Sequence, residues 1–308
     1  MDREPTPPSG TPGNGGRPED RPARLAVGIV GAGRVGTALG VALNRAGHRV
    51  VAAAAVSDRS LRQAEARLPG AALGTPQEVV RAADLVLLTV PDDALADLAA
   101  GLVATGVPVE GKLVAHTSGR YGVGVLEPIT RAGGLPLALH PVMTFTGRPD
   151  DVNRLTGIAF GVTAPDPLRP VAEALVLEMG GEPAWIAEDR RPLYHAALAT
   201  GSNHLVTLVV AAMDLLTRAG VAEPGRMLGP LLGAALDNAL RLGIDGLTGP
   251  VARGDAGTVA DHVAELAQVS PESRAAYVAL ARLTADRALA AGVLKPEDAE
   301  RLLEALAD

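Results

Sequence analysis

The stretch LAVGIVGAGRVGTALGVALNRAGHRV, at positions 25–50, constrains the fold of this 308-residue chain more than any other segment. An apolar run is followed by three glycines, Gly31, Gly33 and Gly36, and then by an alanine-rich helical pattern. In a strand–loop–helix unit, three such glycines permit in turn a tight turn, close approach of the backbone to a pyrophosphate, and close packing of helix on strand. We therefore expect a dinucleotide to rest its phosphates on the N–H groups that begin the helix. A strand–helix turn that binds no ligand is the alternative.

Apolar runs of strand length recur along the chain up to residue 188. They are continuous rather than alternating, which is typical of strands buried on both faces of a parallel sheet. Helical patterns separate them, and TPQE at 75–78 has the form of a capping box with proline at the first helical position. We predict an α/β fold with a doubly wound parallel sheet, the Rossmann fold. The expected strands lie at 25–30, 48–56, 84–90, 112–118, 135–142, 157–164 and 182–187.

After residue 188 the sequence predicts helices only. The stretch 192–219 contains no internal proline, and Ser270 and Lys295, each followed by proline, are expected to begin two further helices. The first residues are rich in Pro, Gly and charge, which is typical of disorder. The expected segments are a disordered tail (1–23), a dinucleotide-binding domain (24–188) and an all-helical substrate and dimerisation domain (189–308).

Composition excludes several classes of function. The net charge of -7 speaks against nucleic acid as the main partner, since a basic face would be required. The chain has no cysteine, and its six histidines lack metal-ligand spacing, so we expect no metal site. The longest uncharged apolar stretch, 204–213, is too short to span a bilayer as a helix. We therefore expect a cytoplasmic protein that acts on a small molecule and not on a membrane.

The residues after the second expected strand bear on which dinucleotide binds. An acidic residue there holds the ribose 2′-OH of NAD, whereas arginine accommodates the 2′-phosphate of NADP. Ser57, Arg59 and Ser60 favour NADP, while Asp58 favours NAD if its side chain points inward. We predict NADP, with NAD as the alternative. The expected cofactor contacts follow the carboxyl ends of four strands: Gly31, Gly33, Arg34, Val35, Gly36, Ser57, Arg59, Ser60, Val90, Pro91, His116 and Thr117.

Five segments point to a known family. They are TVPDDAL (89–95), HTSG (116–119), LHPVMTF (139–145), YHAALATGSNH (194–204) and LTGPVARGD (247–255). In these segments the chain resembles bacterial Rossmann-like proteins that carry a C-terminal domain of unknown function, number 2520. Its architecture is similar to that of pyrroline-5-carboxylate reductase, 6-phosphogluconate dehydrogenase and ketopantoate reductase. The resemblance implies an NADP-linked oxidoreductase, acting on a small 2-oxo acid (ketopantoate favoured) or a cyclic imine. It also implies a homodimer formed through the helical domain.

The proton donor needs separate reasoning. Many proteins of similar architecture use a lysine of the helical domain, but the only lysines here, Lys112 and Lys295, fall outside the matching helix. We therefore expect His195 to supply the proton. Residues seven apart share a helix face, so Ser202 is expected beside it to bind substrate, with Asn203 on the flank to orient the acceptor. Alternatively, His195 only bonds a neighbouring carbonyl.

The remaining candidates lie in loops. Ser118 is expected to orient the acceptor, and His140 is a second catalytic candidate unless it only sets a turn before Pro141. Thr144 is expected near the nicotinamide, where it would contact substrate. Arg253 either clamps a substrate carboxylate or pairs with Asp255. Two other functions stay open: a dinucleotide-binding sensor or scaffold without turnover, which the missing lysine suggests, and an NADP oxidoreductase that uses the deazaflavin F420.

Overall fold

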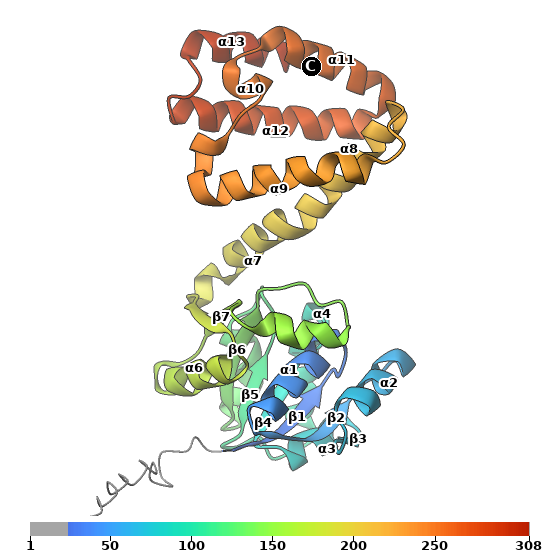
Figure 1. Cartoon of the computed structure of the whole chain (residues 1–308). Helices are drawn as coiled ribbons and strands as arrows, with labels where there is room; N and C mark the ends of the chain where they lie inside the picture. Colours follow the sequence, from blue (N-terminus) through green and yellow to red (C-terminus); the bar gives the residue numbers. More distant parts are fainter. Residues whose placement is uncertain (1–23, 308) are drawn as a thin grey trace, which may run out of the picture. The chain divides into compact units, whose positions relative to one another are not determined.

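The computed structural model describes residues 24–307, which form two compact units (Figure 1). The division falls between Ala199 and Thr200. We call residues 24–199 the sheet unit and residues 200–307 the helical unit. The predicted disordered tail, 1–23, lies outside the described residues.

The sheet unit is built on eight strands in the order β3-β2-β1-β4-β5-β6-β7-β8. The strands are β1 (Ala26–Val30), β2 (Arg49–Ala54), β3 (Ala72–Leu73), β4 (Leu85–Leu88), β5 (Leu113–His116), β6 (Leu135–Pro141), β7 (Ala159–Thr163) and β8 (Glu182–Trp185). The first six follow the doubly wound order, in which ligands bind beyond the carboxyl ends of β1 and β4. The predicted Rossmann fold is confirmed.

Two details of the sheet differ from the sequence prediction. The pair β6–β7 is antiparallel, whereas all other neighbours are parallel. A parallel return requires a crossover, usually a helix, but this connection contains only the 3-10 segment Pro149–Leu155. The strand β3 was not predicted, because it is two residues long and both are exposed.

Helices cover both faces of the sheet (Figure 1). They are α1 (Arg34–Arg45), α2 (Asp58–Arg67), α3 (Pro76–Ala82), α4 (Asp92–Ala104), α5 (Glu127–Arg131) and α6 (Arg169–Glu178). The last helix of the unit, α7 (Arg191–Ala199), follows β8 and adds no residue to either sheet core. Apolar side chains of α1 and α6 form one core with the sheet, and those of α3, α4 and α5 form another on the opposite face. The predicted capping box of α3 is confirmed: Glu78 N donates to Thr75 Oγ1 over 3.3 Å, and Thr75 N donates to Glu78 Oε2 over 2.7 Å.

The helical unit contains no strand among its described residues. It begins with a π-helical segment, Thr200–His204, that continues into α8. The α-helices are α8 (Leu205–Arg218), α9 (Pro224–Leu242), α10 (Pro250–Arg253), α11 (Ala256–Val269), α12 (Pro271–Ala290) and α13 (Pro296–Ala305). The predicted helix starts at Ser270 and Lys295 are confirmed. Helices α11, α12 and α13 build the core of this unit, whereas α8 and α9 bury no residue.

One helical run, Glu188–Arg218, is long and apolar enough to cross a membrane by length and composition alone. Its most apolar 18-residue window has a mean hydropathy of 1.4, and none of that window is buried. From the sequence only the uncharged stretch 204–213 was considered, but the apolar helical run is longer, from Glu188 to Arg218. An exposed apolar helix surface equally suits packing against another protein chain.

Candidate functional site

The glycine loop between β1 and α1 is pinned against the end of β4. Gly31 has φ +96°, and a Cβ there would lie 2.7 Å from the Thr89 carbonyl oxygen. The Thr89 hydroxyl donates to the Gly31 carbonyl oxygen over 2.7 Å. A Cβ on Gly36 would overlap Thr89 Oγ1 and would lie 2.9 Å from Ile29 Cγ2. Both glycines are therefore required by contacts within the protein, as their positions in the motif predict.

Gly33 differs from both, because no protein atom crowds it. Its φ is -87°, and a Cβ would meet only Ser60 Oγ at 3.7 Å and Gly31 O at 3.9 Å. The helix α1 has no side-chain N-cap and no acidic residue in its first turn. The amides of Arg34, Val35 and Gly36 have no intrahelical carbonyl to bond. The open space in front of Gly33 and these donors fit the pyrophosphate of a dinucleotide.

The residues predicted to hold the ribose lie at the start of α2. Ser57 is the N-cap of this helix: its Oγ accepts from Ser60 N over 3.2 Å and lies 2.9 Å from Ser60 Oγ. Arg59 and Asp58 are both exposed in the first turn. The Ser60 hydroxyl faces Gly33, so this helix start borders the glycine loop. The position of these residues suits a ribose or its 2′-phosphate.

Among the candidates that follow β4 and β5, His116 makes its side-chain hydrogen bonds within its own loop. Its side chain is fully buried, Ser118 N donates to its Nδ1 over 3.2 Å, and its Nε2–H donates to the Gly122 carbonyl over 2.8 Å. Burial lowers its pKa to about 4. Both ring nitrogens bond within the protein, so the cofactor contact predicted at His116 stays a prediction that these hydrogen bonds do not favour for the side chain. Val90 and Thr117 are half-buried, and Pro91 is exposed as the N-cap of α4.

Ser118 also organises its own loop. Its Oγ accepts from the backbone N–H groups of Arg120 and Tyr121, both over 3.2 Å, and the side chain is buried. Its carbonyl accepts from Arg191 over 3.3 Å. These contacts fix the turn after β5, and they do not support the predicted role of Ser118 in orienting an acceptor.

Two histidines and a tyrosine meet where β6 ends. The Tyr194 hydroxyl lies 2.8 Å from His140 Nδ1. The His140 and His195 rings are edge-on, with centroids 6.1 Å apart. A Cβ on Gly119 would lie 2.7 Å from His195 Cδ2 and 2.9 Å from His140 Nε2, so both rings converge on this glycine. Burial, followed by the positive charge of Arg191, lowers the pKa of His140 to about 4.

Arg191 lies next to the cluster of His140, Tyr194 and His195. No role was predicted for it from the sequence. Its side chain is fully buried and donates to uncharged oxygens of β6, β7 and the loop after β5. Its guanidinium carbon also lies 5.7 Å from the Tyr194 ring centroid. These contacts bind α7 to the sheet and explain why the unit boundary falls at Ala199 and not at 188. An arginine beside a proline at a helix start gives no sequence signal of burial.

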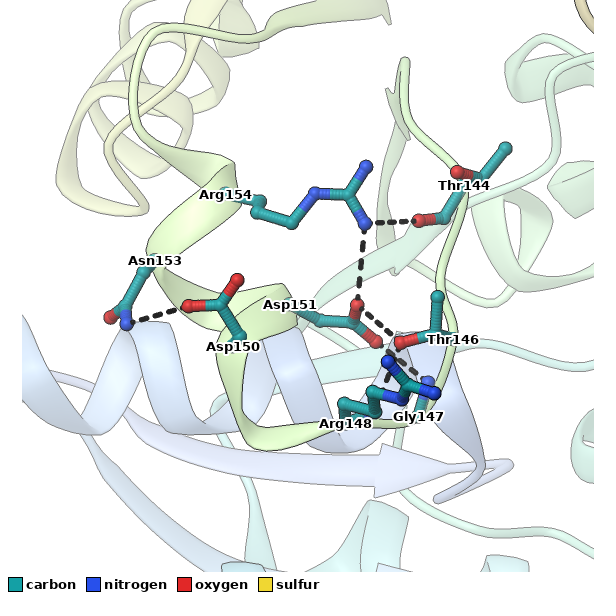
Figure 2. A network of polar contacts seen from close by, with 8 residues as sticks. All are labelled: Thr144, Thr146, Gly147, Arg148, Asp150, Asp151, Asn153 and Arg154. Atoms are coloured by element: carbon teal, nitrogen blue, oxygen red, sulfur yellow. Dashed lines mark hydrogen bonds and ion pairs between the residues drawn. The ribbon is translucent and has the colours of Figure 1, made fainter. Parts of the chain in front are cut away.

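The loop between β6 and β7 carries Thr144 and is held by a buried carboxylate (Figure 2). Asp151 accepts from Thr146 Oγ1 over 3.0 Å and from Gly147 N over 2.7 Å. Arg154 Nη1 donates to the Thr144 carbonyl over 3.4 Å and lies 3.7 Å from Asp151. A Cβ on Gly147 would lie 3.0 Å from the Arg34 side chain. The network thus fixes the loop against the start of α1, beside the open space at Gly33.

The remaining candidates, Ser202, Asn203 and Arg253, belong to the helical unit. Ser202 and Asn203 fall in the π-helical segment, so the seven-residue spacing from His195 does not place them on one α-helical face. Arg253 donates from Nε and Nη2 to one Asp255 oxygen over 3.0 and 2.8 Å. This is the internal pair that the sequence left open. Among the described residues, no group of three His, Cys, Asp or Glu could hold a metal ion.

Comparison with known families accounts for most of the chain. A family model of the Rossmann-like domain matches residues 10–141, and one of the domain of unknown function 2520 (DUF2520) matches residues 158–284. The chain thus matches, in order, a Rossmann-like domain and a C-terminal DUF2520 domain. The resemblance seen in the sequence is confirmed. The DUF2520 match begins just before β7, so His140 comes from the first family domain and Tyr194 and His195 from the second, all within the sheet unit.

Two curated relatives match this chain over only part of their own sequences. A glycerol-3-phosphate dehydrogenase (NAD(P)+) of Bradyrhizobium sp. (strain ORS 278) is 32% identical over 225 residues, which are 68% of this chain and 63% of the relative. The enzyme of the same name from Azorhizobium caulinodans is 33% identical over 226 residues, with the same shares. The chain therefore spans less than two thirds of these relatives.

Solved structures share the fold. An NADP oxidoreductase of Bacteroides fragilis is 24% identical, with a TM-score of 0.71, over 85% of this chain and 98% of its own. An imine reductase of Myxococcus stipitatus, in complex with NADP+, is 20% identical, with a TM-score of 0.59, over 90% and 99%. These structures extend the match in fold across both units.

Proposed function

We propose that this protein is an NAD(P)-dependent oxidoreductase, with NADP the preferred cofactor. The observation that carries the proposal is Gly33, which faces open space at an uncapped helix start although neither its φ nor a neighbouring atom requires glycine. The names of the relatives and of the structural neighbours support the same activity. When bound, a reduced nicotinamide supplies a hydride to an acceptor carbon.

Different residues of the chain would bind the pyrophosphate and the 2′-phosphate of the cofactor. The amides that begin α1 would bind the pyrophosphate, and Thr89 holds the glycine loop in position for it. Arg59 and the hydroxyl of Ser60 would bind the 2′-phosphate of NADP. Arg34, exposed beside Gly147, adds a second cation to the same edge. The excess of arginine over carboxylate at this edge supports NADP over NAD.

We assign the reaction to reduction of a small 2-oxo acid, with ketopantoate favoured, or of a cyclic imine. His195 supplies the proton, and His140 beside it donates a hydrogen bond to the acceptor. The convergence of both rings on Gly119 supports a shared acceptor position. Thr144 remains the proposed contact of the sheet unit with the rest of the substrate, and the roles of Ser202 and Asn203 stay predictions from the sequence.

Calorimetry with the purified chain tests the cofactor. We expect tighter binding of NADPH than of NADH, and Arg59→Ala is expected to weaken NADPH binding at least tenfold while leaving NADH binding unchanged. Arg62→Ala, an exposed arginine on the same helix, is the matched control. Absence of binding of either nucleotide at millimolar concentration would refute the proposal.

A sensor or scaffold without turnover is the second candidate, because neither lysine lies at the site. Lys112 Nζ donates to the Ala83 carbonyl, and Lys295 is the N-cap of α13. This candidate predicts tight binding of NADPH without oxidation of it by ketopantoate, pyrroline-5-carboxylate or other 2-oxo acids. Turnover of any of them decides for the reductase.

We also propose that the protein is a homodimer through α8 and α9. These helices bury no residue, and they expose a set of large apolar side chains that monomers rarely leave in contact with water. The exposed side chains are Leu205, Val206, Leu208, Val210, Met227, Leu231, Leu236, Leu240 and Leu242. A second copy of the same pair of helices would cover them with a surface of equal character.

A further inference from the structure

A buried guanidinium without a counter-ion lies beneath the proposed acceptor position. Arg191 is fully buried, and it makes no ion pair with any described carboxylate. Its nearest acidic influence, Glu188, accepts instead from the backbone amides of Val123 and Gly124. The four oxygens that hold Arg191 are all uncharged: Thr163 Oγ1 at 2.8 Å and the carbonyls of Gly161 at 3.0 Å, Ala138 at 3.2 Å and Ser118 at 3.3 Å. Because no carboxylate pairs with it directly, its positive field is only partly offset, by Glu188, and extends into the site.

The hydrogen bonds of Tyr194 fix the tautomer of His140. The phenol oxygen lies against the backbone of Gly161, and we assign the phenol's own hydrogen to His140 Nδ1, 2.8 Å away. Burial raises the pKa of Tyr194, which keeps that hydrogen on the phenol. With Nδ1 accepting, a neutral His140 carries its hydrogen on Nε2, the atom that faces Gly119 and the ring of His195. His140 is thus set to donate toward the site.

The positive charge of Arg191 opposes a further positive charge on His140. After burial, the influences on this ring are Arg191, His195 and His116, and all three lower its pKa. They come from α7 and β5, the elements that flank the end of β6. Among the described residues, no carboxylate makes a hydrogen bond or ion pair with the His140 ring, whose Nδ1 meets the Tyr194 hydroxyl. A cation placed beside the ring would meet the same repulsion as a proton on it.

From this arrangement we infer that the site selects a neutral carbonyl acceptor over an iminium cation. The inference rests on the proposed oxidoreductase function and narrows its substrate class. As the acceptor carbon gains the hydride, the C=O π electrons move to oxygen, and the nicotinamide is oxidised in the same step. The negative oxygen is stabilised by the His140 Nε2–H and by the field of Arg191, and it takes its proton from His195. An iminium would begin with positive charge and lose it, so the same field would disfavour its binding.

Two acceptors with similar carbon skeletons test whether the site prefers a carbonyl to an iminium. 2-Oxopentanoate and 1-pyrroline-2-carboxylate both carry a carboxylate beside the acceptor carbon, and they differ in a carbonyl oxygen against a protonatable nitrogen. We measure kcat/KM for both with NADPH and the full chain at one pH. The ratio of the two values cancels any loss common to both acceptors, including a smaller folded fraction. We expect the wild type to favour the 2-oxo acid at least tenfold.

Substitution of Arg191 separates charge from structure. Arg191→Met removes the field and is expected to lower the ratio at least fivefold, toward the imine. Arg191→Lys keeps a positive charge and is expected to hold the ratio within twofold of the wild type. A wild type that prefers the imine, or a ratio unchanged in Arg191→Met, overturns the inference.

A spectroscopic measurement without nucleotide or acceptor keeps the inference testable if Arg191→Met does not fold. In the ¹⁵N-labelled full chain, with His140 assigned by loss of its signals in His140→Gln, we expect a neutral Nε2–H ring from pH 7 to pH 5. A His140 imidazolium at pH 6, or an Nδ1–H ring at pH 7, overturns the inference. If NADPH binds but neither acceptor is reduced, both the oxidoreductase proposal and the preference for a carbonyl acceptor are wrong, whatever the protonation state of His140.

Discussion

Thr89, at the end of β4, donates its hydroxyl hydrogen to the carbonyl of Gly31 over 2.7 Å. This bond joins the two neighbouring strands at the point where the sheet order reverses, which is where doubly wound folds bind ligands. The same threonine leaves no room for a side chain on Gly31 or on Gly36, while Gly33 between them remains open. The three glycines of one motif therefore have different physical roles, and substitution can separate them.

Gly36→Ala and Gly33→Ala are expected to differ in what they damage. The first places a Cβ against Thr89 Oγ1 and Ile29, so it should lower the free energy of unfolding by about 1–3 kcal/mol. The second meets no close protein atom and should cost at most about 1 kcal/mol, but should weaken NADPH binding at least tenfold. Chemical denaturation and calorimetry measure the two effects. Equal NADPH affinity of wild type and Gly33→Ala would contradict the assignment of the pyrophosphate.

Tyr194→Phe is expected to reduce activity more than stability. Without its hydroxyl, His140 loses the bond that orients its ring, so kcat for the best acceptor should fall about tenfold with little change in KM. The free energy of unfolding should fall by about 1 kcal/mol, the usual value of one such bond. Tyr277→Phe is the matched control, because Tyr277 makes a similar bond of 2.9 Å to His262 Nδ1 in the helical unit. An equal loss of kcat in the control would contradict the role of Tyr194.

Stability is expected to fall as the pH drops from about 6.5 to about 4. The native state holds His116 neutral, with its pKa lowered to about 4, whereas the unfolded chain binds a proton near pH 6.5. Protonation therefore favours the unfolded chain within this window, by an amount on the order of 3 kcal/mol. Denaturation at pH 7 and pH 5 measures the slope. His116→Gln should reduce the slope without abolishing it, because the pKa of His140 is also lowered to about 4, and the exposed His204→Gln should leave it unchanged.

Arg253→Ala distinguishes the internal ion pair from a substrate contact. Both side chains of the pair with Asp255 are largely solvent-accessible, so its loss should lower the free energy of unfolding by less than about 1 kcal/mol. If the pair is the whole role of Arg253, KM should stay within twofold of the wild type. A tenfold rise in KM without loss of stability would instead establish contact with the substrate carboxylate.

Charges placed on α9 are expected to break the homodimer. Leu231 and Leu240 are 64% and 79% exposed, so glutamate at either position would be tolerated in a monomer but would be buried without a partner in the interface. Light scattering should give the mass of a dimer for the wild type and of a monomer for Leu240→Glu. Leu303→Glu, an exposed leucine on α13, is the control that should remain dimeric. A monomeric wild type would contradict the proposal.

The glycine loop illustrates what local sequence can specify. Gly31, Gly33 and Gly36 act within a single turn, so their spacing alone indicates strand, loop, helix and anion site. The same holds for Thr75 and Glu78, whose capping box closes over three residues. Histidine roles were harder to predict, because they depend on which atoms meet the ring nitrogens in the folded protein: Ser118 and Gly122 of its own loop for His116, and the distant Tyr194 for His140.

The amino-acid sequence by itself determined the doubly wound sheet, the glycine loop and the change to helices, because short-range periodicity and turn chemistry encode each of them. Only the tertiary structure decided that β7 runs antiparallel, that Ser118 and His116 serve their own loop, and that Arg191 lies buried under His140. The antiparallel pairing and the burial of Arg191 depend on contacts between residues far apart in the chain. The bonds of Ser118 and His116 are local, but they form only in the folded turn after β5. The burial and partners of a polar side chain are set by the elements that fold over it, and no local pattern records them.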